Sequence, residues 1–166
     1  MSEPVDRRSK GLTGRRSFEV RATAVATPEE LWPLVGEAAR WKEWSFLDRS
    51  DLIAEGQPVA DGVGAVRRFS SHGVGSQEEV VVWDPPHHLG YAILKGFPVR
   101  HYRGDVHLDA DGSGTAITWS ATFDELIPGT GKVMELVLHS VIKRFMAGLI
   151  RYADQHRTGT GTKSTH

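Results

Sequence analysis

The chain has 166 residues, of which 39% are hydrophobic and 25% charged, a balance typical of one globular domain rather than a disordered chain. It contains no cysteine, which excludes disulfides, thiol catalysis and thiolate metal sites. The segment 17–156 carries 13 basic and 19 acidic side chains, and a folded core that repels phosphate is a poor nucleic-acid binder.

The two ends of the chain differ in composition from its centre. Residues 1–16 are polar and basic, and residues 157–166 are rich in Gly, Thr and Ser, so we expect both to be flexible segments around one domain at 17–156. The first residues lack the apolar stretch of a signal peptide, and no apolar run is long enough to span a bilayer. We therefore expect a cytoplasmic protein without membrane insertion.

The first ordered elements are a strand and two short helices. From Ser17 to Ala24 apolar and polar residues alternate, as in a half-buried strand. Thr27 then has the features of a helix N-cap, with proline next and Glu30 three positions on. The sequence predicts short helices over 28–35 and 37–44, which carry three tryptophans, Trp32, Trp41 and Trp44.

Six further strands follow in quick succession. They are expected at 51–55, 65–71, 77–83, 88–94, 100–109 and 115–124, separated by turns rich in Gly, Asp and Pro. This spacing is typical of an antiparallel meander. Alternation places Tyr91, Tyr102, Trp119 and Phe123 on the apolar face of the sheet, opposite to the charged residues of the strand 100–109.

The last element is a long helix, expected from about Thr130 to His156. Apolar residues recur along it at steps of three and four, through Met134, Val137, Val141, Phe145 and Leu149. Such a broad apolar face needs a concave partner, and most of the preceding chain is strand. The sequence thus predicts an α+β fold in which a curved antiparallel sheet wraps the C-terminal helix.

The order of these elements, together with six short motifs, resembles the polyketide cyclase/dehydrase branch of the SRPBCC superfamily, whose START-like fold is also called helix-grip. The motifs lie at 26–32, 41–44, 62–68, 79–86, 102–104 and 114–119, so the resemblance covers the whole expected domain. It implies a seven-stranded sheet gripping the C-terminal helix, with a cavity for a hydrophobic ligand. It does not specify one function, because this fold hosts cyclases, lipid carriers, receptors and co-chaperones.

The eight histidines do not form a metal-binding pattern in the sequence. His101 and His107 share a strand face but are six residues apart, roughly 20 Å along a strand. His87 and His88 are adjacent and would point to opposite faces. No nucleophile elbow or phosphate-binding loop is present either. We expect no metal and no cofactor.

A pair of adjacent carboxylates, Glu78 and Glu79, is the best candidate for acid–base chemistry. One of them must lean toward the cavity, and it is Glu79 if Val81 and Trp83 also face inward. A carboxylate in an apolar cavity has a raised pKa and can act as a general base. The alternative is an ion pair with Arg67 or Arg68 on the neighbouring strand.

The sequence favours binding of a small hydrophobic molecule, such as a lipid, a polyketide or an aromatic metabolite, in the cavity under the long helix. The expected ligand-binding residues are Tyr91, Tyr102, Trp119, Phe123, Val141, Phe145 and Leu149, with Trp41 and Trp44 as a lid or as a seal for the open end. One alternative is a cyclase or dehydrase that uses Glu79 with Tyr91 or Tyr102. Another is an interaction module, which an exposed patch at Trp41 and Trp44 would favour. We expect a monomer or a homodimer.

Overall fold

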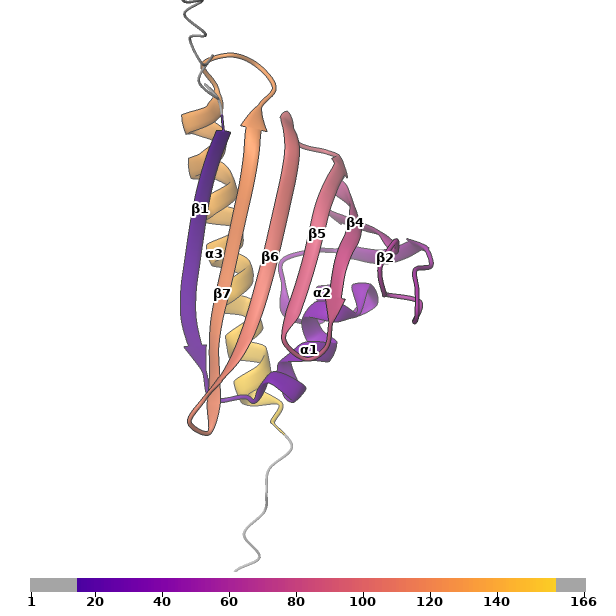
Figure 1. Ribbon diagram of the computed structural model, residues 1–166, viewed down its shortest axis with the longest axis vertical. Helices are drawn as coiled ribbons and strands as arrows, with labels where there is room; N and C mark the ends of the chain where they lie inside the picture. The colour runs from indigo at the N-terminus through magenta and orange to yellow at the C-terminus, as the bar shows by residue number, and fades with distance from the viewer. Residues whose placement is uncertain (1–14, 158–166) are drawn as a thin grey trace, which may run out of the picture.

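A computed structural model describes residues 15–157. It contains a seven-stranded sheet packed against one long helix, with short helices across one end (Figure 1). The elements, in chain order, are β1 (Arg15–Ala24), α1 (Pro28–Gly36), the 3₁₀ turn η1 (Ala38–Arg40), α2 (Trp41–Trp44), β2 (Arg49–Ala54), β3 (Val66–Ser71), β4 (Val74–Asp84), β5 (His88–Lys95), β6 (Val99–Asp111), β7 (Gly114–Glu125) and α3 (Gly131–Gln155). This arrangement confirms the α+β helix-grip fold.

The expected boundaries of the domain differ slightly from the observed ones. β1 begins at Arg15, so Arg15 and Arg16 of the predicted N-terminal segment belong to a strand, where they pair with Asp124 and Phe123. The remainder of the two predicted flexible segments, 1–14 and 158–166, lies outside the described residues. No helix among residues 15–157 is long and apolar enough to cross a membrane.

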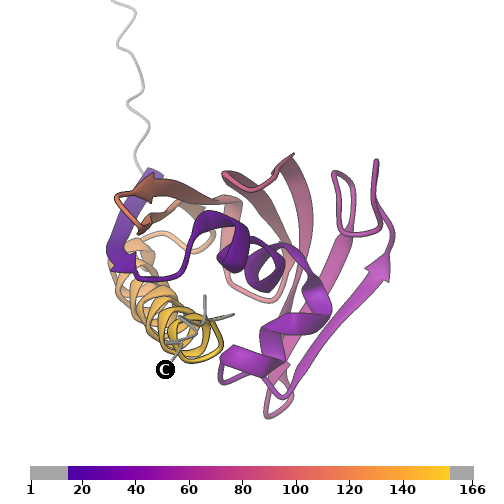
Figure 2. The ribbon, with the colours of Figure 1, turned by 90° about the horizontal axis from the view of Figure 1, so that it is seen from below.

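The sheet has the strand order β1-β7-β6-β5-β4-β3-β2, and every neighbouring pair is antiparallel. Strands β2 to β7 therefore form a meander, and β1 joins it at the edge beside β7. Seen from below, the sheet curves around α3, while α1 and α2 lie across the lower end (Figure 2). This curvature creates the concave face that the apolar helix requires.

Local signals explain where the first helix begins. The Thr27 hydroxyl accepts a hydrogen bond from the backbone N–H of Glu30, and the Glu30 carboxylate accepts one from the backbone N–H of Thr27. This reciprocal capping box satisfies two donors that the first turn leaves free. The predicted start of α1 is confirmed.

The buried stripe of α3 differs from the predicted one at Val137. Its buried apolar side chains are Leu138, Ile142, Phe145, Met146, Leu149 and Ala153. Val137 is 44% exposed, because each residue turns about 100° around the helix axis and the stripe runs through its neighbour Leu138. The expectation that Val137 lies on the inner face is wrong, whereas Phe145 and Leu149 are buried there as predicted.

Candidate functional site

A cavity of about 270 Å³ lies between α3 and the concave face of the sheet. Its walls come from α2, β3 to β6 and the middle of α3, together with the loops next to them. The lining residues are Trp41, Phe46, Leu47, Phe69, Ser70, Ser71, Val74, Gly75, Ser76, Glu78, Tyr91, Ile93, Phe97, Tyr102, Leu138, Val141, Ile142 and Phe145. Most of these side chains are apolar, as in a typical small-molecule pocket.

Burial of the lining residues shows which end of the cavity faces solvent. Val74 is 73% exposed and Phe97 half-buried, and both lie near the turns that connect β3 to β4 and β5 to β6. Trp41 and Tyr91, at 1% and 3% exposure, lie in the interior. The cavity therefore opens between these two turns and α3 and ends at the buried aromatic residues.

The one carboxyl side chain in the cavity wall is that of Glu78, which forms a buried salt bridge with Arg67. Arg67 and Glu78 are directly paired on β3 and β4, and Arg67 Nη2 lies 2.9 Å from Glu78 Oε2. The Arg67 side chain is 0% exposed and that of Glu78 is 8% exposed. Removing two charges from water is costly, so this pair depends on its mutual attraction and on further polar contacts.

Aromatic rings surround the Arg67 guanidinium. Its central carbon lies 5.1 to 5.6 Å from the ring centres of Trp41, Phe69 and Tyr91, and Nη1 donates to the carbonyl of Val35 at 3.3 Å. Cation–π attraction at such distances strengthens when the cation is desolvated. Among the described residues, Nε of Arg67 has no hydrogen-bond partner. The guanidinium is thus held mostly by rings and by one carboxylate.

Burial perturbs the ionisable groups at the inner end of the cavity. It raises the pKa of Glu78 above its ordinary value, and the attraction and hydrogen bond of Arg67 oppose this shift. Burial likewise raises the pKa of Tyr91 and of Tyr102, so both phenols are neutral near pH 7. The inner end combines a carboxylate with two neutral hydroxyl groups that can donate or accept hydrogen bonds.

Two neighbours fix the position of Tyr91. The indole Nε1 of Trp119 donates to the Tyr91 hydroxyl at 2.9 Å. Gly104 lies opposite Tyr91 on β6, and a Cβ at this position would meet the Tyr91 ring at 2.3 Å. The absence of a side chain at Gly104 therefore makes room for the Tyr91 ring.

The structure corrects the prediction for Glu79, since Glu78 is the carboxylate in the cavity wall. The pairing of β4 with β5 shifts between Val80 and Val82, which leaves Val81 without a partner. Such a bulge reverses the side-chain alternation on either side of it. Glu78 and Trp83, which packs on Trp32 of α1, therefore both face inward, although they are five positions apart.

The predicted ligand-binding residues fall into two groups. Five of them line the cavity: Trp41, Tyr91, Tyr102, Val141 and Phe145. The other four, Trp44, Trp119, Phe123 and Leu149, are buried but are not part of its wall. Trp119 still acts on the cavity through its hydrogen bond to Tyr91.

Trp41 and Trp44 are core residues rather than an exposed lid. Their indole N–H groups donate to the carbonyls of Val35 and Leu34, each at 2.9 Å. Trp41 stacks on Phe69 with ring centres 4.6 Å apart. The pair is buried and closes the lower end of the sheet, so the exposed tryptophan patch that would favour an interaction module is not present at these residues.

The sequence offered an ion pair with Arg67 or Arg68 as the alternative, but it assigned Glu79 to the cavity and did not single out the pair of Arg67 with Glu78. A signal for them exists in the tight turn at His72 and Gly73, both of which have positive φ angles of 51° and 80°. A two-residue hairpin loop fixes the register of its strands. Counting outward from Ser71 and Val74 brings Arg67 opposite Glu78, as observed.

Solved structures with the same architecture include three with low sequence identity. Ara h 8.0201 superposes with a TM-score of 0.69 at 18% identity, covering 86% of this chain and 100% of that one. XoxI from Bacillus cereus superposes with a TM-score of 0.67 at 19% sequence identity, covering 84% of this chain and 94% of that one. An uncharacterised protein from Bacillus thuringiensis superposes with a TM-score of 0.70 at 17% sequence identity, covering 83% of this chain and 98% of that one. At these identities the likeness concerns the fold.

Sequence comparison identifies the family. No curated protein sequence is significantly similar to the chain. The model of one family, described as "Polyketide cyclase / dehydrase and lipid transport", matches residues 15–154, nearly all of the described chain. With the helix-grip fold and its internal cavity, this match shows that the chain belongs to the polyketide cyclase/dehydrase and lipid transport family of the SRPBCC superfamily.

Proposed function

We propose that the chain binds one compact, mostly apolar molecule in the cavity, with a polar hydrogen-bond donor of that molecule against Glu78. The observation that carries this proposal is the combination of an apolar cavity of about 270 Å³ with a single buried carboxylate in its wall. The description of the family includes lipid transport, which agrees with an apolar ligand.

The volume and the charge of the cavity narrow the class of ligand. About 270 Å³ is near the lower limit for pockets that hold drug-sized molecules, which favours a compact ring system over a two-chain lipid. Arg67 compensates the charge of Glu78, so a neutral ligand avoids an uncompensated buried charge.

Hydrogen bonding specifies the polar end of the ligand. Among the described residues, the carboxylate of Glu78 is bonded through Oε2 to Arg67, and Oε1 has no partner. A phenol, alcohol or amine N–H of the ligand can donate to Oε1. The hydroxyl of Tyr102 at the same end of the cavity can bind a ligand carbonyl.

A matched pair of substitutions on α3 tests the proposal. Val141 lines the cavity, whereas Val137, one turn earlier on the same helix, points outward. Val141→Trp should fill the cavity and Val137→Trp should leave it open. The measurement is fluorescence titration with N-phenyl-1-naphthylamine, a neutral aromatic amine, together with native mass spectrometry and extraction of molecules bound during expression.

The wild type and Val137→Trp should bind the amine and retain any co-purified apolar molecule, and Val141→Trp should lose both. Binding that survives Val141→Trp would place the ligand elsewhere. If the wild type carries no molecule and shows no thermal shift with a panel of lipids, polyketides and aromatic metabolites, the proposal is wrong.

A second candidate function is an acid–base enzyme such as a cyclase or dehydrase. It is favoured by the raised pKa of Glu78, which now takes the role first assigned to Glu79, with Tyr91 or Tyr102 as its partner. Glu78→Gln separates the two functions. An enzyme would yield product bound to the wild type and a different molecule, the substrate, bound to the variant, whereas a carrier would yield the same molecule from both.

The cytoplasmic location and the monomeric or homodimeric state stay predictions from the sequence. Sedimentation of the purified chain measures its oligomeric state. Binding to Trp41 and Trp44 by a protein partner is not proposed, because both side chains are buried.

A further inference from the structure

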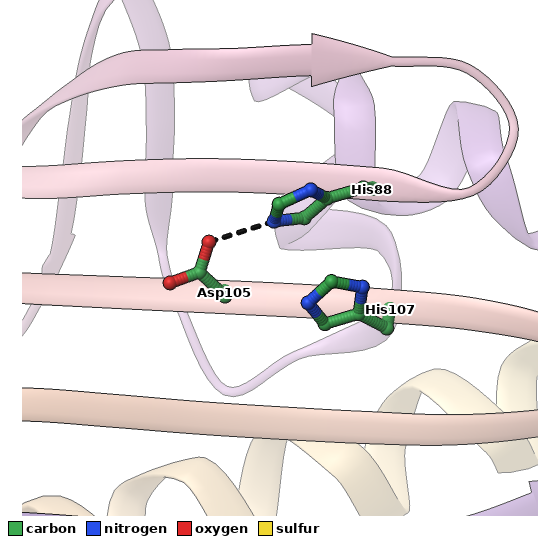
Figure 3. A group of neighbouring side chains, drawn as sticks. All are labelled: His88, Asp105 and His107. Carbon is green, nitrogen blue, oxygen red and sulfur yellow. Dashed lines mark hydrogen bonds and ion pairs between the residues drawn. The ribbon is translucent and has the colours of Figure 1, made fainter.

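Three potential metal ligands meet on the outer face of the sheet, opposite to the cavity. They are His88 of β5 and Asp105 and His107 of β6, and their side chains project from two neighbouring strands toward one another (Figure 3). The candidate ligand atoms all lie within 4.8 Å of one another. Among residues 15–157, this is the one group of three His, Cys, Asp or Glu side chains that meets this condition.

Strand register explains why these residues are close although they are far apart in sequence. His88 and His107 are direct partners in the β5–β6 pairing, and their rings stack with centres 4.0 Å apart. Asp105 is two residues before His107, so it lies on the same face. Its Oδ1 lies 2.7 Å from Nε2 of His88.

We propose that His88, Asp105 and His107 bind one divalent transition-metal ion of the Zn²⁺ class on the outer face of the sheet. Two imidazoles and one carboxylate form a donor set that Zn²⁺, Co²⁺ and Ni²⁺ accept, and open positions remain for water. This site is separate from the cavity and does not depend on the proposed function.

The geometry requires only small side-chain movements. Ligand atoms around a tetrahedral Zn²⁺ with bonds of about 2.0 to 2.1 Å are about 3.3 Å apart. The present separations are at most 4.8 Å, so a bound ion requires the ligand atoms to approach one another by at most about 1.5 Å. The three side chains are half-buried, which leaves the site accessible to ions from solvent.

Charged neighbours both support and weaken the site. Arg103 holds Asp105 in place through bonds from Nε to Oδ2 at 3.0 Å and from Nη2 to Oδ1 at 2.8 Å. Outer partners of this kind orient a metal-binding carboxylate. The charge of Arg103 repels the ion, whereas Asp84, the partner of His88 on β4, is an additional acidic residue nearby. We therefore expect a site of moderate affinity.

The test is calorimetric titration of the untagged full-length chain with ZnCl₂, together with the visible spectrum of the Co²⁺ form. His107→Ala and His88→Gln are compared with His101→Ala, which removes an exposed histidine of the same strand that bonds Asp124 instead. We expect one ion per wild-type chain. Affinity should fall about tenfold or more in the first two variants and be unchanged in the third.

Circular dichroism of each variant shows whether it is folded. The inference is wrong if the wild type does not bind Zn²⁺, or if His107→Ala and His88→Gln, when folded, bind it as the wild type does. It is equally wrong if His101→Ala weakens binding as much as they do, since the ion would then be held by exposed histidines in general. If His107→Ala fails to fold, His88→Gln decides the result.

Discussion

The two faces of the sheet each carry an arginine–carboxylate pair of nearly equal length in very different surroundings. At the inner face, Arg67 lies 2.9 Å from Glu78 of the cavity wall, with side-chain exposures of 0% and 8%. On the outer face, Arg103 and Asp105 are 2.8 Å apart, with exposures of 39% and 20%. Distance alone therefore does not distinguish the two pairs, and burial determines what each can do.

The comparison shows how one type of contact serves two purposes. On the outer face, both partners are partly exposed to water, so the pair contributes little to stability. In the cavity, neither partner can return to water without unfolding, so each depends on the other. A ligand that meets Glu78 meets an acceptor whose position is already fixed.

The largest effect is expected when the inner pair is broken. Arg67→Met leaves Glu78 buried without its counter-charge and should lower the free energy of unfolding by about 3–5 kcal/mol. The matching outer substitution, Arg103→Met, should cost at most about 1 kcal/mol. Urea unfolding at pH 7 measures both. The double variant Arg67→Met/Glu78→Met should recover most of the loss, and equal losses for the two single variants would remove the distinction between the faces.

An intermediate effect is expected from alanine in place of a glycine on each face. Gly104→Ala sets a Cβ against the Tyr91 ring and should cost about 1–3 kcal/mol, as overpacking in a core does, and weaken binding of N-phenyl-1-naphthylamine. Gly90→Ala meets the flexible end of Arg103 at 2.7 Å, which can move into solvent, so its loss should be smaller. Urea unfolding and fluorescence titration compare them. A larger loss for Gly90→Ala would contradict this view of the two faces.

The smallest effect is a dependence of stability on pH. Burial raises the pKa of Glu78 above 4.5, so the folded state binds the proton more tightly than the unfolded state. The contribution of Glu78 to stability is thus present below pH 4.5 and is lost as the pH rises through the folded-state pKa. The difference in unfolding free energy between the wild type and Glu78→Gln should fall over that range.

The exposed residue Glu43 provides a control of opposite sign. The hydrogen bond from Arg40 lowers its pKa, so its contribution is present above pH 4.5 and is lost as the pH falls through the lowered value. Glu43→Gln should therefore differ from the wild type in the opposite direction. If the difference in unfolding free energy between the wild type and Glu78→Gln does not change with pH, Arg67 fully offsets the effect of burial on the pKa of Glu78.

The fold could be predicted from the sequence because its signals are local and repeated. The alternation of apolar and polar residues specifies β6 and β7, and the capping residues around Thr27 specify the start of α1. The structure confirms these three elements. Val137 was misplaced because α3 is apolar on more than one side near its start, where Val133 and Leu136 are also exposed. Hydrophobicity alone cannot orient such a helix.

The site was harder to predict because it depends on strand register that must be known to within one residue. The bulge at Val81 lies within three consecutive valines, Val80 to Val82, which carry no glycine or alternation to mark it. Its effect was to exchange Glu79 for Glu78. The pairing of His88 with His107 was missed for a related reason, because histidines were compared along one strand and not across two. The turn at His72 and Gly73 was the signal that could have located the inner ion pair.

Strand order also bears on how the chain is expected to fold. Strands β2 to β7 pair with chain neighbours, so hairpins can form them early, whereas β1 must pair with β7 across about a hundred residues, as Arg15 does with Asp124. α3 packs mainly against β1, and it supplies one wall of the cavity. Contacts between residues so far apart in sequence are costly to close, so we expect the wall of the cavity that α3 supplies to form late in folding.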